Sequence, residues 1–399
     1  MRWLALIGGV LIQLVIGAVY AWSLFGRALQ APAAMGIGHV AASAPFEVAI
    51  GMIFVGASIG GRLQDRSSPR VVALIGTALY GMGVMLASLA HDSGDLWLLV
   101  LGYGLIGGFG LGMAYIVPVA LLQKWFPRHR AIVTGIAVGG FGFGATLTSP
   151  VANALIAATP SMPTAAFLPL GIGYLALGVL GASLMFSPPD TQESSESGTA
   201  DMTVAEALRT PQWYLLTAIL AVAVAAGISL VSMMAGASVD VGGLDASGAA
   251  AAVGVLALCN GAGRILWASV AQRLGHLRVL AAILALEGLA LLLLPHTTGA
   301  LFLMLAGVVY LCYGGAFGTL PSTAGLFFGL RHAGAIYGLI LVGWSLSGVL
   351  GPLVSSALVG AEGNYTLAFS VMGALAVAGV ALPLLTRPPR RREGVVAGG

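Results

Sequence analysis

Charge is scarce in this sequence, and its scarcity excludes a soluble globular protein. Only 8% of the 399 residues are Asp, Glu, Lys or Arg, whereas 58% are hydrophobic. A soluble domain carries about 25% charged residues. The mean hydropathy of +0.99 instead predicts a polytopic membrane protein that is surrounded by the lipid bilayer.

Cysteine and histidine are also scarce, which argues against disulfide bonds, metal sites and an enzyme. The two cysteines, Cys259 and Cys312, lie in apolar stretches, where a thiol behaves as a small apolar side chain. The six histidines are scattered among loops and segment ends, without a cluster of His, Asp and Glu at one depth. We therefore expect no catalytic residue, no metal and no cofactor.

Twelve apolar stretches are long enough to cross a bilayer as helices, which predicts an all-α membrane fold. They lie near residues 4–26, 45–62, 71–90, 96–122, 131–157, 164–187, 212–236, 247–270, 279–296, 300–328, 334–360 and 365–386. The first stretch is longer than the apolar region of a signal peptide and lacks an obvious cleavage site, so we expect it to be retained as the first helix.

The basic residues predict the orientation, because cytoplasmic loops carry the excess of Lys and Arg. If both termini are cytoplasmic, all but two of the 17 basic residues fall on that side; the exceptions are Arg27 and Arg264. We expect an integral protein of a prokaryotic cytoplasmic membrane, and a monomer. The net charge of +3 follows from this topology and gives no indication of nucleic-acid binding.

A polar, acidic and Ser-rich stretch at residues 188–211 divides the chain. It predicts a cytoplasmic linker between two six-helix halves, residues 1–187 and 212–386, with a cytoplasmic tail at 387–399. Within the linker, Thr203 and Glu206 have the spacing of a capping box and predict a short surface helix.

The two halves resemble each other internally. Arg66 and Arg273 follow the second and eighth stretches 207 residues apart, and the same offset separates Tyr103 from Tyr310. Two repeated halves are typical of secondary transporters, in which the substrate binds at the interface between the halves.

Arg264 is the charged residue that carries most information about function. It lies within Ser247–Gln272, a segment that contains no Asp or Glu. Transferring a lone guanidinium from water to membrane depth costs a free energy of about 3–10 kcal/mol or more. Such a group therefore normally faces a watery cavity or a binding site. We favour an anion-binding role; the alternative is a structural arginine that reaches the cytoplasmic interface.

The spacing of polar residues along the predicted helices indicates a candidate pocket around Arg264. Asn260 is four residues earlier on the same helix face, where its amide can contact the 2-hydroxyl or 2-oxo group of a carboxylate that Arg264 binds. In the first helix, Gln13 and Tyr20 share one stripe and place polar groups near mid-membrane.

Several motifs resemble those of the major facilitator superfamily. The stretch GGRLQDRSSPR, which starts at Gly60, resembles its signature in the loop between helices 2 and 3. The stretches GAVYAWSLF from Gly17, KWFPRHRAIVTGIAVGGFGFG from Lys124 and NGAGRILWASVAQRLG from Asn260 are similar to the monocarboxylate and oxalate/formate porters of that superfamily.

This resemblance implies a fold and further site residues. Helices 1, 4, 7 and 10 line the cavity of the superfamily, which makes Tyr103, Tyr310, Tyr313 and Phe317 its expected aromatic walls, with Tyr103 and Tyr313 as the preferred pair. Helix packing or a membrane aromatic belt is the alternative for each tyrosine. We expect four residues to form a gate at the cytoplasmic ends of the helices: Asp65, Arg66, Arg70 and Arg273. The alternative is that the arginines only set the membrane topology.

Departures from the porters define the expected substrate. Helix 11, from Gly334 to Gly360, has no charge where oxalate exchangers carry a lysine, so a single cation matches a single carboxylate. We expect symport of a short monocarboxylate, such as lactate or pyruvate, with a proton. Exchange of small organic anions is the nearest alternative, and a non-transporting membrane sensor is a remote one.

The residue that couples transport to protons is the weakest prediction. Animal-type monocarboxylate carriers have an acid where this chain has Asn260, so their proton-handling pair is absent. Glu47 and Glu287 are the remaining acids at membrane depth and are the physical candidates. The alternative is that Glu287, in a helix that is peripheral in the resembled fold, packs against a neighbour or faces an interface, and that Glu47 only lies near the outer end of its helix. In a simpler hypothesis, the proton enters together with the anion that Arg264 binds.

Overall fold

The computed structural model describes residues 1–188, 201–359 and 364–389. These residues contain 12 helical segments long and apolar enough to cross a membrane. The predicted all-α membrane fold is therefore confirmed. Each apolar stretch of the sequence corresponds to one helical segment. An apolar chain in a bilayer folds as a helix, because a helix satisfies its backbone hydrogen bonds without water.

The first six segments come before residue 188. They are formed by α1 (Arg2–Gly17) with the 3-10 turn Ala18–Ala21 and α2 (Trp22–Leu29); α3 (His39–Arg66); α4 (Pro69–Ala87); α5 (Leu96–Leu99) with the π-helix Val100–Gly107 and α6 (Gly108–Trp125); α7 (Arg130–Ala158); and α8 (Phe167–Ser183).

The last six segments follow the short helix α9 (Val204–Leu208). They are formed by α10 (Pro211–Asp240), α11 (Ala246–Leu274), α12 (His276–Leu293), α13 (Gly299–Phe328), α14 (Ala333–Ile340) with α15 (Val342–Val359), and α16 (Tyr365–Gly379) with α17 (Ala381–Leu385). The predicted capping box starts α9, where the Thr203 hydroxyl accepts from the Glu206 amide and the Glu206 carboxylate accepts from the Thr203 amide.

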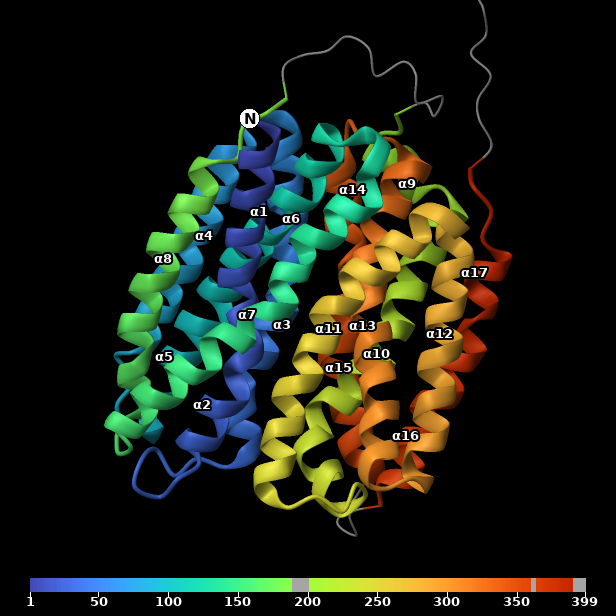
Figure 1. The fold of residues 1–399 in the computed structure, drawn as a ribbon. Coiled ribbons are helices and arrows are strands. Elements are labelled where there is room, and N and C mark those ends of the chain that lie inside the picture. Colours follow the sequence, from blue (N-terminus) through green and yellow to red (C-terminus); the bar gives the residue numbers. More distant parts are fainter. Residues whose placement is uncertain (189–200, 360–363, 390–399) are drawn as a thin grey trace, which may run out of the picture.

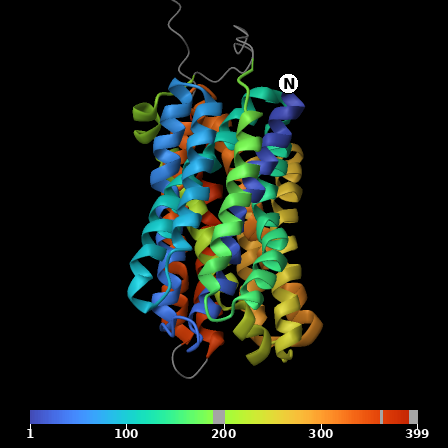
Figure 2. The same cartoon turned by 90° about the vertical axis from the view of Figure 1, so that its left-hand side faces the viewer.

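The two sets of helices lie side by side, from blue to green on the left of Figure 1 and from yellow to red on the right. All run roughly along one long axis, as the turned view in Figure 2 also shows. Most basic residues lie at the end where α1 begins, at the top of Figure 1, which we call the basic end; we call the opposite end the far end.

Glycines bring the halves together along two pairs of helices. A Cβ on Gly142 of α7 would lie 2.6 Å from the Cα of Gly261 on α11, and a Cβ on Gly61 of α3 would clash with the carbonyl of Gly334 in α14. Small residues of this kind allow backbones within a membrane to approach closely. The candidate site lies beside the first of these contacts.

Candidate substrate site at the interface of the halves

Arg264 is fully buried in α11, and residues of both halves surround it. Its Nε donates to the Asn260 side-chain oxygen at 3.3 Å, and its Nη1 donates to the carbonyl oxygen of Val138 in α7 at 3.2 Å. The guanidinium also lies 5.1 Å from the ring of Phe141 and 4.9 Å from the ring of Phe317. Cation–π contacts of this kind hold a cation between aromatic faces.

The charge of Arg264 has no counter-ion in the described part of the chain. Its Nη2 lacks a hydrogen-bond partner there, and the ion pair found in these residues joins Lys124 to Asp65. The guanidinium is planar and presents its donors as a rigid fork. This geometry leaves one arm of the fork free for an oxygen acceptor.

Glycines in the neighbouring helices allow this arrangement. Cβ atoms on Gly135 of α7 and on Gly318 of α13 would both clash with the carbonyl oxygen of Arg264. The backbones of one helix from each half therefore approach α11 at the level of Arg264. A movement of the halves against each other necessarily changes the surroundings of the guanidinium.

Two tyrosines bridge the halves next to Arg264. The hydroxyl of Tyr20, in the 3-10 turn of the first segment, lies 3.1 Å from the hydroxyl of Tyr313 in α13. Tyr20 packs edge-on against Phe141 at 5.1 Å and interacts electrostatically with Arg264. The structure thus brings four of the residues predicted from the sequence, Asn260, Tyr20, Tyr313 and Phe317, into one cluster with Arg264.

An aromatic layer behind Arg264 did not follow from the sequence reasoning. Trp344 of α15 is fully buried, with its ring 4.7 Å from Phe317, 5.7 Å from Phe141 and 5.4 Å from Tyr115. These rings come from four different helices, two in each half, so the periodicity within one helix does not show that they meet. The one available signal was that Phe141 lies within the glycine-rich motif that resembles the porters.

Tyr103 and Tyr310 lie elsewhere. Tyr103 packs against Trp22 at 4.4 Å, and its hydroxyl donates to the Val19 carbonyl at 3.4 Å. Tyr310 belongs to a separate apolar cluster of the second half. Of the two tyrosines preferred as aromatic walls, Tyr313 lies in the cluster with Arg264 and Tyr103 packs against Trp22; Tyr20 is the residue that meets Tyr313. Tyr103 lies in the π-helix Val100–Gly107, where the usual helical period does not apply.

Gln13 is buried in α1, where its amide nitrogen donates to the Tyr115 carbonyl of α6 at 3.1 Å. Its side-chain oxygen has no partner among the described residues. Gln13 therefore ties two helices of the first half together through the backbone of an aromatic-layer residue.

The two membrane acids differ in their surroundings. Glu47 is partly exposed and accepts a hydrogen bond from the Ser43 hydroxyl at 2.9 Å. Glu287 is fully buried in α12, and neither of its carboxylate oxygens has a hydrogen-bond partner in the described ranges.

Of the four predicted gating residues, Asp65 joins the two halves. Its Oδ2 accepts from the Ala335 amide at 2.8 Å, near the start of α14, and its Oδ1 lies 3.5 Å from the Lys124 ammonium. A carboxylate is stabilised there by the partial positive charge of a helix N-terminus. The contributions of Lys124 and of the Ala335 amide had no signal in the sequence.

The other three gating candidates are exposed at the basic end. The Arg70 guanidinium lies 5.6 Å from the ring of Phe186 in the first half. Among the residues that the structure describes, the side chains of Arg66 and Arg273 make no hydrogen bond or ion pair across the halves.

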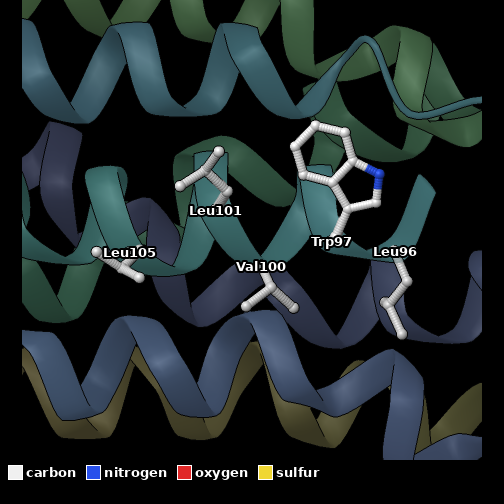
Figure 3. Close-up of a pocket in the computed structure, with 5 residues that line it drawn as sticks. All are labelled: Leu96, Trp97, Val100, Leu101 and Leu105. Atoms are coloured by element: carbon white, nitrogen blue, oxygen red, sulfur yellow. The ribbon is translucent and has the colours of Figure 1, made fainter.

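A shallow pocket on the first half is apolar and remote from this cluster. Its lining side chains all belong to α5 and the π-helix, as Figure 3 shows: Leu96, Trp97, Val100, Leu101 and Leu105. Its side chains offer the indole N–H of Trp97 as a polar group and no cation that would pair with an anion.

Similarity searches identify proteins that share both the sequence and the fold. The chain is 29% identical to the uncharacterized MFS-type transporter YhjX of Escherichia coli (strain K12), over 87% of this chain and 86% of that protein. It is 25% identical to the oxalate:formate antiporter of Oxalobacter formigenes, over 98% and 94%. It is 26% identical to the apicoplast pyruvate carrier 1 of Toxoplasma gondii, over 98% and 91%.

Solved structures share the fold at lower identity. The proton:xylose symporter XylE superimposes with a TM-score of 0.76 and 15% identity, over 95% of this chain and 94% of that chain. The profile of the Major Facilitator Superfamily matches residues 2–263 and 236–398. Together with the twelve spans, this match shows that the chain belongs to the Major Facilitator Superfamily and is a membrane transporter of that family.

Proposed function

We propose that this protein is a secondary active transporter of short monocarboxylates of the lactate and pyruvate type, and that it moves them together with a proton by alternating access. The observation that carries this proposal is Arg264, a fully buried cation at the interface of the halves that has no counter-ion among the described residues. A charge buried in this way is costly unless an anion neutralises it.

The charge of the site supports a single carboxylate. The described residues place no second cation with Arg264, and α15 carries no charge. A dianion would leave one carboxylate buried without a partner, which is strongly unfavourable. The substrate carboxylate can take the free Nη2 and replace the weak bond from Nη1 to Val138, which yields a bidentate pair.

The neighbouring groups support a small substrate with a polar 2-substituent. The hydroxyls of Tyr20 and Tyr313 and the Asn260 amide are polar groups of the cluster around Arg264. They can donate to a 2-oxo group or bond to a 2-hydroxyl group. The Asn260 side-chain nitrogen donates to the Tyr310 carbonyl at 3.5 Å, a long bond that a substrate oxygen can replace. Phe141 and Phe317 flank the cation, and their apolar rings suit a short aliphatic chain.

The contacts at the basic end support alternating access. Asp65 binds the start of α14 across the halves, and Gly61 contacts Gly334 beside it. We infer that these contacts close the cytoplasmic side, that both termini are cytoplasmic and that the membrane is the cytoplasmic membrane of a prokaryote. Neutralising Arg264 with substrate would allow the site to stay sealed while the halves reorient.

An exchanger of small organic anions is the second candidate. The similarity to the oxalate:formate antiporter over 98% of this chain supports it. The two functions differ in what they require, because an exchanger needs an anion on the far side of the membrane and a symporter does not.

Uptake into proteoliposomes tests the proposal. We expect labelled L-lactate to accumulate when the exterior is acidic and the interior is at pH 7 without preloaded anion, and we expect Arg264→Ala to abolish this uptake. Uptake that requires preloaded anion in the native protein would identify the exchanger. Uptake that is unchanged in Arg264→Ala would contradict the assigned role of Arg264.

A further inference from the structure

Glu287 is a second buried ionisable group, and the binding of a carboxylate at Arg264 does not involve it directly. It lies in α12 with no exposed surface, and both carboxylate oxygens lack hydrogen-bond partners in the described part of the chain. The next residue, Gly288, faces α16, where its Cβ would lie 2.8 Å from the Gly373 carbonyl oxygen. Glu287 itself interacts electrostatically with Cys312 and Tyr313 of α13.

In the described ranges, the titratable side chains that interact electrostatically with Glu287 are Cys312 and Tyr313 of α13. Helices α10, α11, α16 and α17 also pack against α12. The ionisable side chains on these helices are Tyr214, Asp240, Cys259, Arg264, Arg273 and Tyr365. None of them has a resolved interaction with Glu287 in the described ranges. An ionised Glu287 would therefore be a buried charge without compensation, which is strongly penalised; a bound proton removes that penalty.

Tyr313 connects Glu287 to the site. It interacts electrostatically with Glu287 and with Arg264, and its hydroxyl lies 3.1 Å from that of Tyr20. Tyr20 in turn interacts with Arg264. Two buried groups of opposite charge thus both interact with Tyr313, whose hydroxyl lies next to that of Tyr20.

We propose that Glu287 binds the proton that is transported with the carboxylate; this inference rests on the proposed function. An anion bound at Arg264 brings negative charge to the tyrosine pair and favours protonation of Glu287. By reciprocity, a proton on Glu287 strengthens anion binding. The proton comes from bulk water on the side where the anion enters, and it returns to bulk water on the other side.

The test separates accumulation from exchange in proteoliposomes. For the native protein we expect labelled L-lactate to accumulate by up to about tenfold for each unit of acid-exterior pH difference, because one pH unit is a tenfold proton gradient. Glu287→Gln imitates the protonated side chain. It should retain counterflow of L-lactate at equal pH and lose accumulation driven by the pH difference.

A binding measurement provides a readout that a purely structural role would not change. L-lactate should bind native protein more tightly as the pH falls, and its affinity for Glu287→Gln should not depend on pH over the same range. If Glu287→Gln does not fold, Glu287→Asp tests the same proposal. This variant keeps a carboxyl group but places it at a different depth, so proton-coupled uptake of L-lactate should persist and its dependence on pH should be displaced.

Several results would overturn the proposal. Accumulation by Glu287→Gln that equals the native level would do so, as would an unaltered pH profile of Glu287→Asp. Loss of accumulation in Glu47→Gln with normal coupling in Glu287→Gln would assign the proton to Glu47 instead. If native protein shows neither uptake nor counterflow of any monocarboxylate, the proposed function itself fails, and this inference falls with it.

Discussion

At the scale of single residues, Tyr313 makes the contact that most directly links the halves beside the candidate site. Tyr313→Phe removes the hydroxyl that meets Tyr20 at 3.1 Å. One such hydrogen bond contributes about 0.5–1.5 kcal/mol, so we expect the affinity for L-lactate to fall by about two- to tenfold. Equilibrium binding of labelled L-lactate measures this change.

Tyr310→Phe is the matched control for this prediction. Its hydroxyl lies in the same helix but has no hydrogen-bond partner among the described residues. Its affinity should equal that of the native protein. An equal loss of L-lactate affinity in Tyr313→Phe and Tyr310→Phe would show that removing any tyrosine hydroxyl from α13 weakens binding. That result would contradict a specific role of Tyr313.

The residue scale also shows what sequence could predict. The contact between Asn260 and Arg264 followed from their spacing of four residues, and the structure places them in contact. The positions of Trp344 and Phe141 around the guanidinium could not be predicted, because they depend on how four helices cross. Tyr103 was expected as a cavity wall because its helix lines the cavity in the resembled superfamily, and the structure places its side chain against Trp22 and the Val19 carbonyl instead.

At the scale of helices, the approach of α13 to α11 holds the site residues in place. A Cβ on Gly314 would clash with the Asn260 carbonyl oxygen. Overpacking of this kind costs about 1–3 kcal/mol, so Gly314→Ala should lower the thermal midpoint in detergent and weaken L-lactate binding. The control is Gly307→Ala in the same helix, where the nearest atoms are 3.8 and 3.9 Å away.

Gly307→Ala should be neutral or slightly stabilising, because alanine favours helix more than glycine does. If Gly314→Ala and Gly307→Ala have the same midpoint and the same affinity, the contact between α11 and α13 does not position the site. The measurement is a thermal unfolding curve together with L-lactate binding for each variant.

The helices themselves could be predicted well, and their interruptions could not. The apolar stretches identify all twelve spans, because hydropathy and length are local properties. The break between α14 and α15 falls at Leu341, where neither proline nor glycine stands. Beyond this break, the Ser345 hydroxyl of α15 donates to the Ile50 carbonyl of α3 in the other half at 2.8 Å, a long-range contact that no local pattern shows.

At the scale of the whole molecule, the closed basic end makes Asp65 a determinant of conformation. Its charge-assisted bond to the Ala335 amide joins the halves. Such bonds contribute about 1.5–3 kcal/mol, so Asp65→Asn should raise the population open at the basic end by about tenfold or more. Spin labels at the exposed positions Ser67 and Leu274 report the distance between the halves.

We expect Asp65→Asn to shift the Ser67–Leu274 distances to longer values, with Cys259 and Cys312 replaced by alanine in all samples. Asp92→Asn, which removes an exposed charge at the far end, serves as the control and should leave the distances unchanged. Identical distributions for the native protein and Asp65→Asn would show that this contact does not set the resting conformation.

The central claim is that Arg264 binds one carboxylate, and ligand-dependent thermal stability tests it most directly. A ligand at about 100 times its Kd stabilises the folded state by about 2.7 kcal/mol. We predict that L-lactate raises the unfolding midpoint of the native protein, that oxalate at the same concentration raises it far less, and that neither stabilises Arg264→Ala. Stabilisation of Arg264→Ala by L-lactate, or equal stabilisation of the native protein by oxalate, would contradict the account.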